Sequence, residues 1–294
     1  MTTHADEFEI HRSRLFGLAY RMLGSAEEAE DTVQDAYLRW SSADRGDVER
    51  PGAWLAKAVT NLCLTRLTSA RARREVYPGP WLPEPVVTSD GALGPLESAE
   101  QRDAVSFALL VLLERLTPAE RAVYVLREAF AYGYREIAEV LDLGEANCRQ
   151  LHRRATQRLS AEGTRFEAEP ERQARLVESF LTAARDGDVA ELERLLAADV
   201  TWWGDGGGKV SAARRPIEGR ERVLRVMAIG FRRYIAPLGL TVEEINGATA
   251  LVARDGDEIV GVITLEIHEG VITEVRAVVN PDKLAFVKRQ LGGA

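Results

Sequence analysis

The residues with the clearest chemistry lie between positions 145 and 154. The outward side of a helical pattern there carries five polar residues: Asn147, Arg149, Gln150, Arg153 and Arg154. Arginine and glutamine side chains read base edges in the major groove of DNA, and further arginines hold phosphates. An exposed basic amphipathic helix is the alternative interpretation of the same pattern, so the elements that would position these residues decide between the two.

Those elements have the spacing of a helix-turn-helix. A supporting helix carries Ile137, Ala138 and Leu141 inward, a turn follows at Asp142-Leu143-Gly144, and the second helix turns Cys148 and Leu151 inward. Upstream, Thr117, Pro118 and Glu120 predict a capped helix start, and another helix is expected around Ala99 to Arg115. Residues 99–163 are therefore predicted to be an all-helical DNA-binding domain.

A second helical domain is predicted for residues 1–75. Gly24-Ser25 separates two amphipathic helices, Ser25 and Glu28 form a candidate capping box, and Pro51 opens a third helix. Asp31 and Asp35 lie four residues apart with Gln34 beside them, which suits a basic protein surface, although a solvated face is the alternative. A run of arginines ends the third helix: Arg66, Arg71, Arg73 and Arg74.

Residues 76–98 are predicted to be a proline-rich linker. Five of the eleven prolines fall between positions 78 and 95, and proline disfavours regular helix. A flexible spacer would be polar, yet this one contains Trp81 and Leu82. The aromatic residue indicates that the linker packs on something.

From residue 170 to residue 294 the pattern changes to helices followed by alternating strands. The expected helices are Arg172–Arg185, Val189–Ala197 and Arg220–Tyr234, and the expected strands are Val200–Trp203, Leu240–Ile245, Ala248–Val252, Glu258–Ile267 and Val271–Val279. Turns at Asn246-Gly247, Asp255-Gly256 and Glu269-Gly270 have hairpin chemistry. The pattern predicts helices on a curved antiparallel sheet, an α+β cone.

Composition limits the remaining options. The net charge of −8 argues against a simple nucleic-acid coat, although local charge matters more than the total. The two cysteines do not suit a disulfide framework, no Cys/His cluster has zinc spacing, and no cofactor is expected. Apolar runs are too short for a membrane span and no secretory signal is present, so we expect a cytoplasmic protein without membrane contact.

Together these stretches resemble the extracytoplasmic-function family of RNA polymerase sigma factors. Residues 29–40 are similar to the family's polymerase-docking helix, residues 54–63 to the helix that melts and reads the −10 element, and residues 116–159 to the segment that reads the −35 element. The resemblance implies a chain that docks on the β and β′ subunits of the polymerase core and binds promoter DNA. Trp54 is expected to serve core packing.

The resemblance assigns residues to two surfaces. Core polymerase would be bound by Asp31, Gln34, Asp35 and Arg39. Promoter DNA would be bound by Asn61, Arg66, Arg71, Arg73 and Arg74 in the first domain and by Asn147, Arg149, Gln150, Arg153 and Arg154 in the second.

Three further motifs resemble a particular branch of that family, the SigJ type with a fused SnoaL-like domain. They are Trp81-Leu82-Pro83-Glu84-Pro85 in the linker, Asp205-Gly206-Gly207-Gly208-Lys209 in a loop, and Asn280-Pro281-Asp282-Lys283-Leu284 near the end. The fold class implied is multidomain: two all-α sigma domains followed by an α+β SnoaL-like cone. In that branch the appended domain is thought to tune activity in cis.

The motifs predict a specific docking arrangement. The glycine loop would dock on the linker with Trp81 and Leu82 packed and Lys209 near Glu84, while the motif at residues 280–284 would clamp the cone to the sigma domains. Ending the chain before Asn280 should then raise transcription, and ending it before Asp205 should lower it.

Two other functions stay open at this point. SnoaL-like cones include cyclases and isomerases, and this cone offers Glu266 and His268 on one face of a strand; we expect no catalysis, but a pocket that senses a small-molecule ligand is an alternative. The second open function is that of a helix-turn-helix regulator that binds DNA without polymerase. The resemblance of residues 29–40 to a polymerase-docking helix argues against it.

Overall fold

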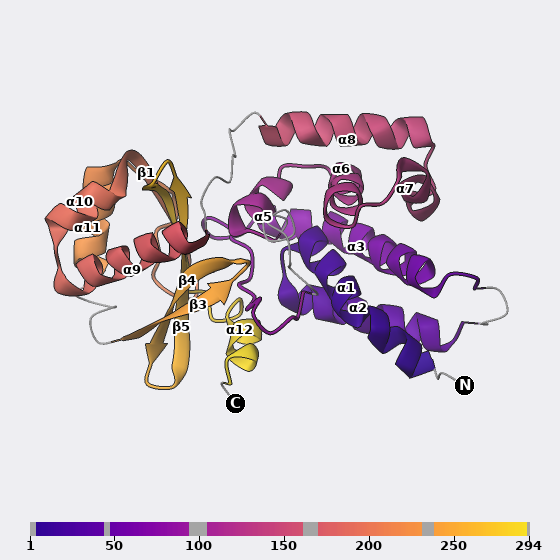
Figure 1. Ribbon diagram of the computed structural model, residues 1–294, viewed down its shortest axis with the longest axis horizontal. Helices are drawn as coiled ribbons and strands as arrows, with labels where there is room; N and C mark the ends of the chain where they lie inside the picture. Colours follow the sequence, from indigo (N-terminus) through magenta and orange to yellow (C-terminus); the bar gives the residue numbers. More distant parts are fainter. Residues whose placement is uncertain (1–3, 44–47, 94–104, 161–169, 231–237, 293–294) are drawn as a thin grey trace. The chain divides into compact units, whose positions relative to one another are not determined.

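The computed structural model describes residues 4–43, 48–93, 105–160, 170–230 and 238–292 (Figure 1). The chain forms two compact units. One comprises residues 1–75 and 90–164, and the other comprises residues 76–89 and 165–294. Most of the segment predicted to be a separate linker therefore belongs to the C-terminal unit, and each unit is described by itself.

The first unit opens with three helices, α1 (His4–Leu23), α2 (Ala26–Ser41) and α3 (Pro51–Glu75). Gly24 takes a left-handed φ of 66° at the end of α1, and the Ser25 hydroxyl accepts from the Glu28 amide at 3.1 Å to begin α2. Trp40 is buried and its ring lies 5.5 Å from that of Trp54 between centroids. The expected contribution of Trp54 to packing agrees with this contact.

The same unit continues with α5 (Phe107–Leu113), α6 (Pro118–Tyr124), the π-helical turn η2 (Val125–Ala129), α7 (Tyr134–Leu141) and α8 (Glu145–Ser160). The predicted capping box is confirmed, since Thr117 and Glu120 bond each other's backbone amides. Of the helix expected from Ala99 to Arg115, the described residues form α5, Phe107–Leu113. Ser106 caps α5 by accepting from the Leu109 amide at 3.2 Å, and residues 99–104 lie outside the described residues.

The second unit contains α9 (Pro170–Asp186), α10 (Val189–Leu195), β1 (Leu196–Asp205), β2 (Ile217–Glu218), α11 (Arg220–Gly230), β3 (Gly239–Ile245), β4 (Ala248–Asp255), β5 (Glu258–His268), β6 (Val271–Val278) and α12 (Ala285–Gln290). The strands form one sheet in the order β2-β1-β6-β5-β4-β3. The sheet is mixed, because β1 pairs with β6 in parallel, so the expectation of a purely antiparallel sheet is wrong. A hairpin can join only antiparallel neighbours, whereas β1 and β6 are separated in the chain by α11 and four strands, β2 to β5.

All three predicted hairpin turns join antiparallel neighbours, and Gly256 takes a φ of 59° between β4 and β5. The other two turns share one conformation. Asn246 and Gly247 take φ values of 53° and 74° between β3 and β4, and Glu269 and Gly270 take 51° and 82° between β5 and β6. Positive φ at both central residues is the requirement of a type I′ turn, which asparagine and glycine meet at little cost.

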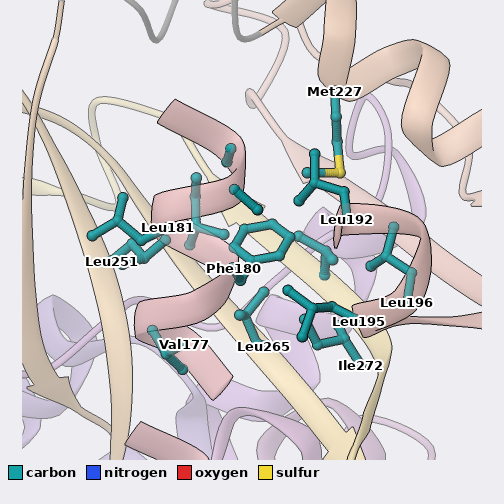
Figure 2. Close-up of a cluster of buried hydrophobic side chains, with 14 of the residues drawn as sticks. Val177, Phe180, Leu181, Leu192, Leu195, Leu196, Met227, Leu251, Leu265 and Ile272 are labelled. Atoms are coloured by element: carbon teal, nitrogen blue, oxygen red, sulfur yellow. The ribbon is translucent and has the colours of Figure 1, made fainter. Parts of the chain in front are cut away.

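An apolar cluster holds α9, α10 and α11 on one face of this sheet (Figure 2). Phe180 and Leu181 of α9 and Met227 of α11 meet Leu251 of β4 and Leu265 of β5, all buried. Burying side chains of this size contributes about 1.5–3 kcal/mol each. This face of the sheet is therefore filled by the domain's own core.

Candidate nucleic-acid interface and motif cluster

The helix-turn-helix geometry lies in α7, α8 and the turn between them. Asp142 ends α7 in a left-handed conformation with φ 53°, and the Cys148 amide donates to the Gly144 carbonyl at 3.1 Å as α8 begins. Aspartate is one of the few non-glycine residues that adopts this conformation readily. Ile137 of α7 and Cys148 of α8 are buried. The residue that turns the chain is therefore Asp142, and not the glycine of the same turn.

The outward face of α8 carries the predicted polar residues together. Asn147, Arg149, Gln150, Arg153 and Arg154 are all exposed on this one helix. Beneath it, the Arg158 guanidinium donates to the buried Glu120 carboxylate at 2.6 Å and ties α8 to α6. An exposed row of cations and amides on a supported helix is the arrangement that major-groove contacts require.

The docking face predicted on α2 is also exposed. Asp31, Gln34 and Arg39 are exposed, Asp35 is half-buried, and Leu38 between them keeps 58% of its surface accessible. A single exposed leucine is common on protein surfaces, so the docking prediction depends on the exposed charged residues of α2.

Arg66 contacts both docking carboxylates. Its guanidinium lies 2.7 Å from Asp35 and 3.9 Å from Asp31. The sequence assigned Arg66 to DNA and the two carboxylates to polymerase. The structure brings them together, so in this state Arg66 compensates the negative charge of α2.

Arg74 is also placed differently from the expectation. Its guanidinium donates to Glu114 and to the Leu23 carbonyl, and only 14% of the side chain is exposed. A phosphate would have to displace both partners. Asn61 is half-buried, and the side chains of Arg71 and Arg73 lie outside what the structure describes.

The N-terminal helices and the helix-turn-helix pack on each other, which the sequence did not predict. The Lys57 ammonium of α3 donates to Asp142 at 2.7 Å and to the Glu139 carbonyl at 2.8 Å. Arg121 of α6 is buried and donates to the Met22 carbonyl at 2.9 Å. Burial lowers the pKa of Arg121 to about 9, so the guanidinium remains charged at neutral pH. Lys57 is one of only four lysines, and that scarcity was the available signal.

In the C-terminal unit, Asp205 is the centre of a buried polar cluster. It is 1% exposed, and its carboxylate accepts from the Leu82 amide at 2.9 Å, from the Tyr77 hydroxyl at 2.5 Å and from the Lys283 ammonium at 2.7 Å. The Gly207 amide donates to it at 3.1 Å. One carboxylate thus joins all three sequence motifs.

Lys283 provides the compensating charge. Its buried ammonium also donates to the Leu82 carbonyl, and it lies 4.1 Å from the centre of the Trp81 ring and 4.8 Å from that of Tyr77. Cation–π contacts of this kind stabilise a desolvated ammonium. Burial, followed by the hydrogen bond to Asp205, raises the pKa of Tyr77, which keeps its hydroxyl protonated as a donor.

Lys209 does not make the predicted contact with Glu84. It lies at the surface, where its ammonium is 2.6 Å from Asp282. Glu84 is buried and Trp81 is only half-buried. The loop contacts the linker as expected, but through Asp205, whose carboxylate is paired with Lys283 after the last strand.

The linker continues along the sheet as an added edge. Val87 forms a β-bridge with Ile245, and the Thr88 amide donates to the Glu244 carbonyl at 3.1 Å. The Gln290 side chain of α12 bonds both the amide and the carbonyl of Val87, at 2.9 and 3.0 Å. Residues 77–88 are therefore held at both ends.

Comparisons with known proteins agree with this arrangement. A family model described as sigma-70 region 2 matches residues 8–73, and one described as sigma-70, region 4 matches residues 106–159. The ECF RNA polymerase sigma factor SigJ of Mycobacterium tuberculosis is 37% identical, over 94% of this chain and 92% of its own length.

The chain is an ECF sigma factor. The probable ECF sigma factor SigI of the same organism is 31% identical over 97% of this chain and 96% of its own length. The crystal structure of Mycobacterium tuberculosis SigJ superimposes with a TM-score of 0.77 and 33% identity, covering 96% of this chain and 98% of that one. The C-terminal domain of this sigma factor has an α+β fold, with helices on a mixed sheet of six strands.

The residues considered for catalysis in this sigma factor lie away from its apolar cluster. Leu265 and Ile267 of β5 point into the cluster, so Glu266 and His268 lie on the opposite face. Glu266 is engaged by Arg276 at 3.1 Å. Within the described residues, no helix is long and apolar enough to cross a bilayer, and no group of three His, Cys, Asp or Glu side chains is placed to hold a metal.

Proposed function

We propose that this sigma factor recognises −10 and −35 promoter elements while docked on core polymerase, and that its C-terminal domain tunes this activity in cis by holding the linker. Region 2 would bind the β and β′ subunits through α2, and region 4 would read the −35 element through α8. The observation that carries the cis-regulatory part is the set of hydrogen bonds from residues 77–88 to the C-terminal domain.

The distance between the promoter elements gives the held linker a consequence. Their names place them about 25 base pairs apart, which is ~85 Å of B-form DNA. A compact unit of ~150 residues has a diameter of about 40 Å. Regions 2 and 4 must therefore separate before both elements are contacted.

The linker limits how far they can separate. Fully extended, residues 76–105 reach about 100 Å, whereas residues 89–105 alone reach about 60 Å. Holding residues 77–88 on the C-terminal domain removes part of this reach. We therefore expect release of the linker to favour the promoter-bound state in the cytoplasm, where core polymerase is found.

The two truncations suggested by the sequence are not equally informative. Ending the chain before Asn280 removes Lys283 and α12 but leaves β6 complete, and we expect transcription to rise. Ending it before Asp205 removes β2 to β6 and exposes the apolar cluster, so a fall in activity would reflect unfolding.

A single substitution tests the loop instead. Gly208 has φ 73°, and a Cβ there would meet Cγ of Pro78 in the linker at 2.9 Å, so Gly208→Ala should push the linker away. Gly187→Ala is the matched control, since Gly187 has φ 69° and nothing within 4 Å of its Cβ position. Both variants carry the same backbone strain.

In vitro transcription with purified core should be higher for Gly208→Ala than for Gly187→Ala. Lower transcription by Gly208→Ala would mean that the held linker favours transcription, and the proposed direction of regulation would then be wrong. Equal activity of both variants and of the truncation before Asn280 would overturn regulation in cis. Absence of transcription when the wild-type chain is added to core would overturn the initiation role.

The alternatives of a cyclase, an isomerase or a ligand sensor in the cone gain no support from the contacts described. Apolar side chains fill the helix-covered face of the sheet, and the candidate acid lies on the other face in an ion pair.

A further inference from the structure

The side chain of Arg149 is held in place before any DNA is bound. Its guanidinium pairs with Glu145 on the same helix and lies 5.4 Å from the centre of the Tyr134 ring on α7. The side chain is still 57% exposed, so a ligand can reach it. A side chain positioned in this way loses less conformational freedom when it binds.

Tyr134 is itself fixed from several directions. Arg127 lies 4.9 Å from its ring centre, and its hydroxyl is 3.1 Å from Nδ1 of His152. Nε2 of that histidine lies 2.9 Å from Glu128. Tyr134 therefore links α7 to η2 through Arg127 and to α8 through His152.

The neutral imidazole satisfies this chain of hydrogen bonds. In the tautomer with its proton on Nε2, Nδ1 accepts from the Tyr134 hydroxyl and Nε2–H donates to the Glu128 carboxylate, so each ring nitrogen has a partner. Tyr124 stacks on the same imidazole, with centroids 6.1 Å apart. The Tyr134 ring is also held without its hydroxyl, because its centroid lies 5.9 Å from that of His152 and Arg127 lies over it. The ring presents a face to Arg149.

We infer that Tyr134 is a specificity-determining positioning residue, which acts by holding Arg149 in the orientation that reads one base pair of the −35 element. The inference rests on the proposed base-reading role of Arg149. It assigns the effect to the face of the aromatic ring and not to the hydroxyl. Other contacts of α8 with DNA, including those of Arg153, do not depend on the ring.

The test measures base discrimination position by position. Holoenzyme assembled from core polymerase and the full-length chain is assayed on a promoter series in which each −35 base pair is substituted in turn. Arg149→Ala should reduce discrimination at one position by about 5- to 150-fold, the range expected for loss of a base contact. Tyr134→Leu should reduce it about 2- to 5-fold at that same position only, as expected for an exposed cation–π contact.

Two further variants separate the ring from the hydroxyl and from general stability. Tyr134→Phe keeps the ring and should retain the wild-type discrimination, even if losing the bond to His152 lowers the stability of region 4. Phenylalanines with increasing fluorination at position 134 keep the shape but weaken the ring's attraction for a cation. Discrimination should fall in step with fluorination, and this series remains interpretable if the leucine variant unfolds.

Each outcome decides one of the two claims. If Arg149→Ala changes no single position, the base-reading role fails, and the inference with it. If Arg149→Ala acts at one position but Tyr134→Leu acts at none or at all positions equally, only the inference fails. The inference also fails if Tyr134→Phe matches Tyr134→Leu, if fluorination has no effect, or if Tyr134→Leu reduces discrimination further in the Arg149→Ala background.

Discussion

The helix-turn-helix and the C-terminal domain use polar residues in opposite ways. The five candidate DNA-binding residues of α8 are all exposed, whereas Asp205, Asn280 and Lys283 of the motif cluster are each at most 5% exposed. Exposed polar side chains keep their water until a partner replaces it. Buried ones need permanent partners, because an unpaired buried charge costs several kcal/mol. The difference indicates that one set is arranged for an external ligand and the other for a contact within the chain.

The largest effect is expected for the buried ion pair between Asp205 and Lys283. Lys283→Met leaves the Asp205 carboxylate buried without its cation, and removing one partner of a buried pair costs about 3–5 kcal/mol. Amide hydrogen exchange in the sheet of the C-terminal domain should show that the free energy of opening falls by this amount. Lys209→Met is the matched control, because its surface pair with Asp282 contributes only about 0–1 kcal/mol.

A double substitution checks that explanation. Asp205→Leu combined with Lys283→Met removes both charges, so it should be less destabilising than Lys283→Met alone. Equal losses of stability in Lys283→Met and Lys209→Met would contradict the view that burial makes the Lys283–Asp205 pair more important than the surface pair of Lys209 with Asp282.

The next prediction concerns the exposed face of α2. Asp31→Lys should weaken binding to core polymerase by about 2–4 kcal/mol, since a like charge placed at an interface costs several kcal/mol. Asp35→Lys should weaken it as well, but it also sets a cation beside Arg66, 2.7 Å from the native carboxylate. An affinity measurement with core and an unfolding curve for each variant separate the two effects. Unchanged affinity for Asp31→Lys would remove α2 from the polymerase interface.

The recognition helix should show a smaller, sequence-dependent effect. Arg149→Ala is expected to cost about 1–3 kcal/mol of promoter binding and to relax specificity at one position. Gel-shift titrations of the holoenzyme on promoter variants measure both quantities. A uniform loss across all variants would instead mean that Arg149 holds a phosphate.

The smallest effect is expected where regions 2 and 4 touch at the surface. Lys57→Met removes an exposed ion pair between α3 and α7, worth about 0–1 kcal/mol, and should shift the two regions slightly toward separation. Fluorescence energy transfer between labels on α3 and α8 would report the shift. Arg135→Met is the control, because its pair with Glu139 lies within α7. A shift of the same size in the control would rule out the Lys57 contact as the cause.

Much of the helical fold and its surface could be predicted from the sequence. The capping box at Thr117 and Glu120 depends on residues three apart, and the outward face of α8 depends on helical period, so both are local properties. The type I′ hairpins at Asn246 and Glu269 are local as well. The resemblance to the sigma family rested on such stretches, and the comparisons confirmed it.

The tertiary structure alone decided which charged residues meet. Tyr77 bonds Asp205 across 128 positions and Asn280 across 203, and no local pattern specifies such pairs. The sequence predicted Lys209 as the cation of the contact with the linker, and the structure has Lys283 there instead. The buried end of β1 lies beside the end of β6, so the residues that follow β6 lie close to Asp205. This places Lys283 in a desolvated ion pair with Asp205, while Lys209 stays at the surface. Whether a charged side chain must have a partner depends on its place in the fold. Burial, and not residue type, sets the free-energy cost of leaving the charge unpaired.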